Sequence, residues 1–364
     1  MQYRSFGAID FRPSVLGFGA MRLPQLADEP EAAGPYGRVD VETANAMLRR
    51  AVEAGVNYVD TAYPYHDGAS ERWLGQALRV VARDLFGPGD AGFAELRAGS
   101  VTKLREYDVL SWAEEALAAG RIGHLGFSFH DQYPVFEEVV DATDLWEFCQ
   151  IQYNFMDEEF QAGTRGLEYA ASKGLGVIVM EPLRGGRLSR RPPEGVATLW
   201  AAANAQREAA GAAPRSPVDW ALRWVWDHAE VSFLLSGMSS MDQLEENLAC
   251  AEQAAVGVLS ADELDVYRQV RDAYLACSPI DCTNCRYCLP CPSGVAIPEV
   301  LGLYNEAIIY NGGPAAARFA YGWLPEPQRA EACTQCHDCE ELCPQQIAIP
   351  DWLEKIRQYL AVGE

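Results

Sequence analysis

Positive charge is scarce in this sequence. Its 364 residues include 29 lysines and arginines against 52 aspartates and glutamates, which gives a formal net charge of −23 at pH 7. Proteins that bind nucleic acid or anionic membranes neutralise phosphates with clustered cations. The composition therefore argues against both partners and leaves a small-molecule substrate or another protein.

Long apolar runs are also missing. Hydrophobic residues make up 49% of the chain, but no run approaches the roughly 20 residues that a membrane-spanning helix needs. The first residues, MQYRSFGAID, carry no apolar segment after their charge, so no export signal is predicted. We expect a cytoplasmic protein that is long enough for one large domain and one small domain.

Cysteine is nearly absent from the first three quarters of the chain. Of the eleven cysteines, only Cys149 and Cys250 lie upstream of Cys277, and the other nine fall between Cys277 and Cys343. This clustering favours a metal-binding domain in a reducing compartment over a disulfide scaffold. Cys149, Cys250 and Cys277 are predicted to be small buried hydrophobic residues.

Strand and helix patterns alternate along the first 259 residues. Strand patterns cover 15–23, 57–60, 99–104, 122–129, 148–155, 175–180 and 231–235, and amphipathic helix patterns lie between most of them. This alternation predicts a parallel sheet, and the number of units predicts a closed (β/α)8 barrel of the TIM type. A hairpin over residues 1–15 is expected to plug its bottom.

One stretch carries a sign of catalysis, NYVDTAYPYHDGASERWLG at 57–75. Asp60 ends a predicted strand and Tyr65 follows five residues later, which puts two ionisable groups where parallel α/β folds build their reaction centres. An aspartate that only caps the turn is the simpler alternative. However, the letters D-T-A-x-x-Y and G-x-S-E-x-x-L-G together resemble the signature of the aldo/keto reductases.

The resemblance becomes incomplete in the middle of the barrel. Aldo/keto reductases end their third strand with a catalytic lysine and their fourth with a catalytic histidine. GSVTKL at 99–104 looks like the end of strand three, with Lys103 as the lysine, and the helix predicted at 108–120 follows almost directly. Because a βα unit needs about 30 residues, we expect an open or distorted barrel without its fourth strand unit, covered there by irregular residues 85–98.

The resemblance also assigns catalytic roles. Tyr65 would protonate a carbonyl oxygen, Lys103 would lower the pKa of the tyrosine by its charge, and Asp60 would pair with the lysine. The family histidine, which orients the carbonyl, has no counterpart at its position. His130 is the nearest substitute, although an exposed loop histidine is the simpler interpretation. Carbonyl reduction should therefore be weak.

Fragments after the later strands resemble the NAD(P) contacts of the family. They would hold the carboxamide after strands five and six, the pyrophosphate after strand seven, and the adenosine after the last strand. Met180 stands where the family often stacks an aromatic ring on the nicotinamide, and position 237 often carries a lysine for the 2′-phosphate. The resemblance thus implies NADP or NAD without deciding between them. The predicted contacts are Ser128, Gln150, Leu183, Arg184, Gly185, Gly237, Glu246 and Asn247.

Two sets of four cysteines, each followed by proline, have the spacing of cluster-binding ferredoxins or come within one residue of it. Three cysteines at two-residue gaps bind three corners of a cubane, and the distal Cys-Pro reaches the other cluster. Two structural zincs or disulfides are the alternatives, but zinc usually takes two C-x2-C pairs separated by a spacer. We assign one 4Fe–4S cluster to Cys282, Cys285, Cys288 and Cys343, and the other to Cys333, Cys336, Cys339 and Cys291.

The whole chain resembles aldo/keto reductases with a fused ferredoxin-type tail. Helical patterns at 298–310 and 314–322 make the tail similar to the two-cluster module of respiratory iron–sulfur subunits. We expect a barrel over 1–259, a connecting helix over 260–276 and a mainly helical two-cluster domain over 277–364.

This resemblance implies an iron–sulfur oxidoreductase of the aldo/keto reductase type. It would couple NAD(P)H, or an organic carbonyl or alcohol, to electron transfer through both clusters, with a ferredoxin or flavoprotein as redox partner. The alternative is an electron-transfer subunit whose barrel is a scaffold that has lost carbonyl reductase activity. Reduction of small carbonyls by NAD(P)H would distinguish the two.

Overall fold

The structure is a computed structural model that describes residues 1–26, 38–63, 65–81, 93–97, 101–282, 286–310 and 313–360. For a few of these, 93–97 and 101–103 among them, the description covers the backbone alone. The chain divides into two compact units. The first comprises Met1–Gly186 and Arg215–Ser260, and the second comprises Arg187–Pro214 and Ala261–Glu364.

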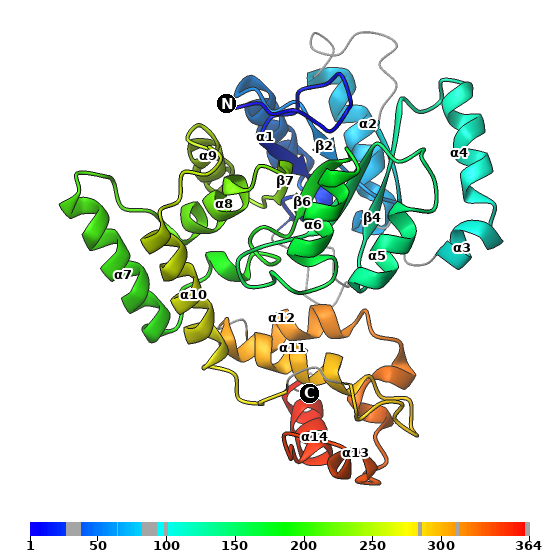
Figure 1. Ribbon diagram of the computed structural model, residues 1–364, viewed down its shortest axis with the longest axis vertical. Coiled ribbons are helices and arrows are strands. Elements are labelled where there is room, and N and C mark those ends of the chain that lie inside the picture. Colours follow the sequence, from blue (N-terminus) through cyan, green and yellow to red (C-terminus); the bar gives the residue numbers. More distant parts are fainter. Residues whose placement is uncertain are drawn as a thin grey trace. The chain divides into compact units, whose positions relative to one another are not determined.

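A parallel sheet of seven strands forms the centre of the first unit (Figure 1). The strand order is β2-β1-β7-β6-β5-β4-β3, and every pairing is parallel. Among the described residues nothing pairs β2 with β3, so the sheet is open between them. The barrel-type α/β fold with a missing strand unit is confirmed. The strands are β1 (Leu16–Gly19), β2 (Val59–Asp60), β3 (Phe93–Arg97), β4 (His124–Phe129), β5 (Phe148–Gln152), β6 (Gly176–Met180) and β7 (Val231–Gly237).

Helices connect the strands and cover the sheet. Local sequence fixes where several begin: the Asp40 side chain accepts a hydrogen bond from the Thr43 backbone N–H at 3.2 Å, and Ser216 does the same for Asp219 at 3.0 Å. The helical segments of the first unit are η1 (Ala20–Arg22), α1 (Val41–Glu53), η2 (Tyr65–Gly68), α2 (Ala69–Val81), α3 (Val101–Glu106), α4 (Val109–Ala118), α5 (Tyr133–Val140), α6 (Gly163–Ser172), α8 (Pro217–Asp227) and α9 (Met241–Ala251).

The N-terminal residues close one end of the sheet. Backbone bridges at Tyr3↔Ser14 and Phe6↔Ile9 form the predicted hairpin. The ring of Phe6 is fully buried, with its centroid 5.4 Å from that of Phe148 and 5.3 Å from that of Phe233. Since Phe148 is the first residue of β5, the plug lies at the amino ends of the strands. The carboxyl ends are left for a functional site.

Only one described strand, β3, stands between β2 and β4 in the chain, where the family pattern has two. β3 pairs with β4 from Phe93↔His124 to Arg97↔Ser128, and β4 is the strand that we matched to the fifth of the family. β3 therefore adjoins the strand matched to the fifth of the family, and one of the two family strands before it is missing. Residues 82–92 alone separate α2 from β3, too few for a βα unit of about 30 residues.

Two expectations about this region were therefore wrong. Residues 101–104 do not end a strand, because they lie in α3, where VTKLRE contains several good helix formers. The irregular cover expected at 85–98 contains β3, and its other residues lie outside the described part of the chain. Arg97, not Lys103, is the last residue of the edge strand.

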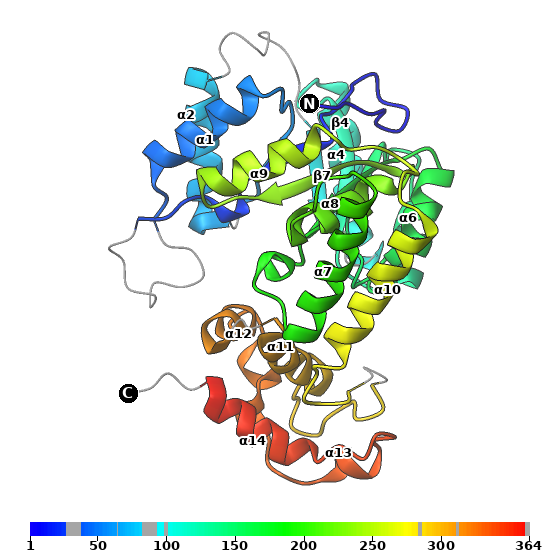
Figure 2. The same cartoon turned by 90° about the vertical axis from the view of Figure 1, so that its left-hand side faces the viewer.

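The second unit is mainly helical and includes a segment that the sequence assigned to the barrel. Residues 187–214 contain α7, which packs along α10 (Figures 1 and 2). The rings of Trp200 and Tyr267 are 5.8 Å apart, and Arg207 forms an ion pair with Glu263 at 2.7 Å. These contacts explain why 187–214 groups with this unit. Its helical segments are η3 (Arg187–Ser189), α7 (Glu194–Ala209), α10 (Ala261–Leu275), α11 (Ile297–Ile309), α12 (Gly313–Tyr321), η4 (Glu326–Gln328), η5 (Ala330–Ala332), α13 (Asp338–Glu341) and α14 (Ile349–Leu360).

The core of the second unit lies among α11, α12 and α14. Val300, Leu301, Leu353 and Ile356 are buried there, and six of the cluster-type cysteines are partly buried against this core. The apolar residues hold the cysteine loops on one side and leave them partly exposed on the other. No helix in the described ranges combines the length and apolarity needed to span a bilayer.

Candidate active site and cluster-binding domain

Asp60 and Tyr65 lie at the carboxyl end of β2. Asp60 pairs with Gly19 of β1, and Tyr65 begins η2. The buried Ser70 hydroxyl donates to the Ala20 carbonyl at 3.1 Å and lies 2.8 Å from the Thr61 hydroxyl. The serine and threonine of the signature thus fasten the turn that carries Tyr65 to the end of β1.

Burial raises the pKa of the Asp60 carboxyl to about 6. A neighbouring lysine would lower it instead, and no cation contributes to this shift among the described residues. Lys103 lies in α3, and its side chain is outside the description. The pairing of Asp60 with Lys103 therefore stays a prediction without structural support. His130, just past β4, is exposed.

A row of residues crosses the sheet from its open edge. Arg97 pairs with Ser128, Ser128 with Gln150, and Gln150 with Ile178. Paired residues on neighbouring parallel strands belong to the same face of a sheet. The row therefore places the two predicted carboxamide contacts, Ser128 and Gln150, next to each other. Arg97 is a member that the sequence analysis missed, because its strand was not recognised.

Gln150 has an unsatisfied polar atom. Its side chain is 4% exposed, its Nε2 lies 4.0 Å from the Met180 sulfur, and its buried Oε1 has no hydrogen-bond partner among the described residues. A buried acceptor without a donor costs about 1–3 kcal/mol. A ligand N–H would remove this cost, and the amide of a nicotinamide is such a donor. The site therefore fits the group that the resemblance implies.

The predicted pyrophosphate loop follows β6 and turns sharply. Glu181, Arg184 and Gly185 all have positive φ, at 53°, 49° and 64°. The Arg184 N–H donates to the Glu181 carbonyl at 2.9 Å. Leu183 lies between these residues and is half-buried. The loop is compact, and its role at a pyrophosphate stays a prediction.

A buried carboxylate anchors this loop. Asp157 is 6% exposed, and its Oδ2 lies 3.0 Å from Arg184 Nε. The same oxygen accepts hydrogen bonds from Gln152 at 2.7 Å and from Asn154 at 3.0 Å. The Asn154 amide also donates to the Glu181 carbonyl at 3.2 Å. The sequence analysis missed Asp157, which ties the loop after β6 to the turn after β5.

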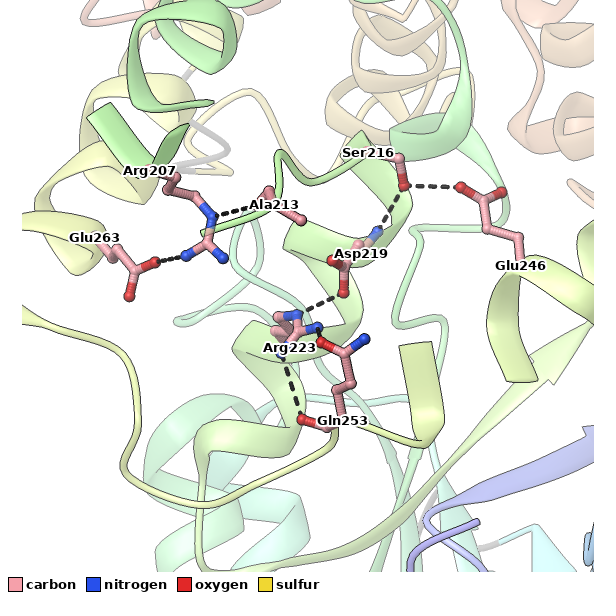
Figure 3. A network of polar contacts seen from close by, with 8 residues as sticks. All are labelled: Arg207, Ala213, Ser216, Asp219, Arg223, Glu246, Gln253 and Glu263. Carbon is pink, nitrogen blue, oxygen red and sulfur yellow. Dashed lines mark hydrogen bonds and ion pairs between the residues drawn. The ribbon is translucent and has the colours of Figure 1, made fainter. Parts of the chain in front are cut away.

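The predicted adenosine contacts already have partners inside the first unit. Asn247 is 3% exposed and donates to the Ser236 hydroxyl at 2.8 Å. Glu246 accepts a hydrogen bond at 2.7 Å from Ser216, the N-cap of α8 (Figure 3). These side chains join α9 to β7 and to α8. Gly237 ends β7, directly before the turn into α9. Whether this segment also binds adenosine stays a prediction.

The cysteines of the second unit form two groups that cross the sequence order. Cys343 lines a small cavity together with Cys282 and Cys288, although it lies far from them in the sequence. Burial is the main cause that raises the pKa of the Cys339 thiol to about 11, and the charges of Cys291, Cys333 and Cys336 add to it. Both groups support the crossed assignment. Cys285 lies outside the described residues.

Disulfides and structural zinc are the two alternatives for the described cysteines. None of them forms a disulfide bond. Within the described ranges, no three His, Cys, Asp or Glu side chains are close enough to hold a single metal ion. A structural zinc needs its ligands around one ion, whereas each cysteine of a cubane binds its own iron. The preference for 4Fe–4S clusters over zinc rests on the sequence spacing, which is C-x2-C-x2-C-x3-C-P in the second set.

Local backbone geometry shapes the cysteine loops. Residues between the cysteines adopt the left-handed conformation, with φ of 65° at Arg286, 55° at Gln335 and 65° at His337. The Gln335 N–H donates to the Cys333 sulfur at 3.4 Å. Cys277 was expected to be buried but is exposed, because it follows the end of α10.

An asparagine clamps the chain that enters the first group of cysteines. Asn305 on α11 accepts a hydrogen bond from the Ile280 N–H at 3.1 Å and donates to the Ile280 carbonyl at 2.7 Å. Both groups are buried. This pair of bonds fixes the backbone two residues before Cys282.

Comparison with known sequences identifies the family of the chain. The profile of the aldo/keto reductase family matches residues 15–86 and 105–270. The chain belongs to the aldo/keto reductase family. The profile of the 4Fe-4S dicluster domain matches residues 281–349, so this aldo/keto reductase domain is followed by a C-terminal dicluster domain. The interval between the two matched parts of the reductase profile includes β3 and the place of the missing strand unit.

Named relatives resemble the reductase part. L-galactose dehydrogenase of Arabidopsis thaliana is 25% identical over 303 residues, covering 70% of this chain and 89% of the relative. Aflatoxin B1 aldehyde reductase member 4 of Homo sapiens is 26% identical over 302 residues, covering 64% of this chain and 89% of the relative. The holo form of an aldo-keto reductase from Bacillus halodurans superposes with a TM-score of 0.58 at 23% identity, covering 74% of this chain and 96% of that structure. This last likeness shows the fold alone.

Proposed function

We propose that this aldo/keto reductase is a cytoplasmic NAD(P)-linked oxidoreductase for a small carbonyl or alcohol substrate. Its two 4Fe–4S clusters would exchange electrons with a ferredoxin or flavoprotein. The observation that carries the proposal is the buried Oε1 of Gln150, which lacks a donor among the described residues and lies in register with Ser128. Family membership and the clustered cysteines support the redox assignment.

The barrel residues would bind and orient the nucleotide, which supplies a hydride when bound. Gln150 Oε1 would accept the carboxamide N–H, and the Ser128 hydroxyl stands beside it in the row. Asp157 holds Arg184 and thereby fixes the loop over 181–186 before any ligand arrives. A preformed loop loses less conformational entropy on binding.

Tyr65 would deliver the proton to the carbonyl oxygen, with Asp60 as its neighbour at the end of β2. The raised pKa of Asp60, about 6, keeps a fraction of this carboxyl protonated near neutral pH. Lys103 lies in a helix, so it does not stand at a strand end, where the family places the lysine that lowers the pKa of the tyrosine. We therefore expect slow carbonyl reduction.

The cysteines would hold two clusters that carry single electrons, whereas hydride transfer moves two electrons together. Two clusters can store both electrons of one hydride equivalent, one on each. A redox protein would then exchange them singly. The lost strand unit favours a second candidate function, in which the barrel is a scaffold of an electron-transfer subunit and turns over no carbonyl.

Nucleotide binding to anaerobically prepared holo-protein tests the proposal. NADPH or NADH should bind in calorimetry, and Gln150→Ala should weaken binding by about 10-fold through loss of one hydrogen bond, with iron content unchanged. Gln132→Ala, at an exposed glutamine before α5, is the matched control. Absence of binding by either nucleotide, together with cluster reduction by a partner protein, would favour the scaffold function.

A further inference from the structure

The turns over residues 286–289 and 337–340 have the same backbone geometry. Arg286 and His337 each follow the second cysteine of their set, and both have a φ of 65°. The Leu289 N–H donates to the Arg286 carbonyl at 3.0 Å, and the Glu340 N–H donates to the His337 carbonyl at 3.0 Å. The two turns can therefore be compared position by position.

The side-chain charges of the two cysteine sets differ at these matched positions. The first three cysteines of the first set lie in CTNCRYC at 282–288, which contains one arginine and no acidic residue. Those of the second set lie in CTQCHDC at 333–339, which contains Asp338 and neither lysine nor arginine. Two clusters held by these cysteines would thus have charges of opposite sign beside them.

Arg286 lines the small cavity of the first cysteine group. It is the one charged side chain among the described residues around this cavity, which include Cys282, Cys288 and Cys343. Arg286 Nη2 donates to Glu299 Oε1 at 2.6 Å, and Glu299 is not among those lining residues. The ion pair therefore has its positive member at the cavity.

Glu299 holds the guanidinium in place from α11. The residue before it, Pro298, is buried and lines the same cavity. The second carboxylate oxygen, Glu299 Oε2, is buried and has no hydrogen-bond partner among the described residues. Because the effect of a charge falls with distance, the arginine at the cavity should outweigh the carboxylate behind it.

We propose that Arg286 raises the reduction potential of one cluster above that of the other. The inference rests on the two clusters of the proposed function and adds the order in which they are reduced. Reduction transfers one electron from a redox partner to a cluster, which adds one negative charge and breaks no bond. A neighbouring cation stabilises this added charge, whereas Asp338 opposes it beside the second cluster. The first cluster, which takes up the first electron, is the one assigned to Cys282, Cys285, Cys288 and Cys343.

A redox titration of the reconstituted full-length protein tests this order without relying on turnover. Electron paramagnetic resonance under anaerobic conditions should show two one-electron steps in the wild type. Arg286→Gln should lower the reduction equilibrium constant of the step at higher potential about 10-fold, a shift of about 59 mV. The other step should stay within about twofold. Glutamine suits the backbone at this position, because Gln335 and Gln346 adopt φ of 55° and 54°.

Three further variants separate charge from structure. Arg286→Lys keeps the positive charge and should leave both steps within about twofold of the wild type. Asp338→Asn should raise the step at lower potential by up to about 10-fold, and it tests the asymmetry even if Arg286→Gln proves unstable. Arg268→Gln removes the cation of an exposed ion pair with Asp265 on α10 and is the control, with both steps unchanged. Iron content reports cluster assembly in each variant.

The outcomes distinguish this inference from the proposed function. If Arg286→Gln moves the lower step or neither step, or if Arg286→Lys lowers the higher step as much as Arg286→Gln does, the role of Arg286 is overturned. Retention of about eight irons and of nucleotide binding in the same proteins would leave the proposed function standing. About four irons in reconstituted wild-type protein would refute the two-cluster assignment, and the reduction order with it.

Discussion

The crossed grouping of the cysteines predicts a specific pattern of iron loss. Two 4Fe–4S clusters hold about eight irons per chain, so loss of one cluster leaves about four. Cys343 lines a cavity with Cys282 and Cys288, whereas Cys339, only four positions earlier, is close to Cys291. Close neighbours in the sequence should therefore serve different clusters. Alanine is the suitable replacement, because a serine oxygen can still bind iron.

Double variants convert this geometry into iron counts. Cys343→Ala with Cys282→Ala removes two ligands of one cluster and should leave about four irons per chain. Cys343→Ala with Cys339→Ala removes one ligand from each cluster and should leave almost none. If each set of four cysteines bound its own cluster, these two results would be exchanged.

Iron and acid-labile sulfide are measured after anaerobic reconstitution, and electron paramagnetic resonance of the reduced protein shows whether two coupled clusters or one remain. Cys277→Ala, at the exposed cysteine beyond α10, is the control and should keep about eight irons. About four irons retained in the Cys343→Ala, Cys339→Ala protein would refute the crossed ligation.

Two further predictions concern single side chains. Asp60→Asn should raise the free energy of unfolding of the barrel above pH 6, because the pKa of Asp60 is about 6 in the fold and lower in the unfolded chain. The gain should be at most about 3 kcal/mol, and solvent screening of the half-buried side chain should reduce it. The gain should vanish as the pH falls toward 4 in urea titrations followed by tryptophan fluorescence, and a loss of stability at pH 8 would instead indicate pairing with Lys103. Asn305→Ala removes both hydrogen bonds to Ile280 and should cost about 1–3 kcal/mol. Faster bleaching of the cluster bound by Cys282 under a chelator would show the effect, and an unchanged rate would contradict it.

Local spacing made much of this protein predictable. The cysteine sets, the D-T-A-x-x-Y signature and the strand at 175–180 are each encoded within a few residues. In the structure Asp60 ends β2, and residues 176–180 form β6. The misassigned strand, in contrast, cannot be located from local spacing. GSVTKL contains a lysine in a strand-like context, and only the pairing of Arg97 with Ser128 shows that the edge strand lies earlier in the chain.

Contacts between distant segments account for the other differences. Trp200 and Tyr267 lie against each other in the second unit, yet the order of elements places α7 among the barrel helices. The ion pair between Arg184 and Asp157 likewise joins separate turns. No periodicity within either segment predicts such pairs, because each half alone is an ordinary polar turn or helix.

The division of the second unit into two chain segments has a consequence for biosynthesis. α7 leaves the ribosome before residues 210–260, and at roughly 5–20 residues per second its partner α10 begins to emerge several seconds later. Trp200 of α7 lacks its ring partner Tyr267 during that interval. A chain truncated after Ser260 would leave Trp200 without this partner permanently. An isolated barrel therefore requires replacement of residues 187–214 as well as removal of the tail.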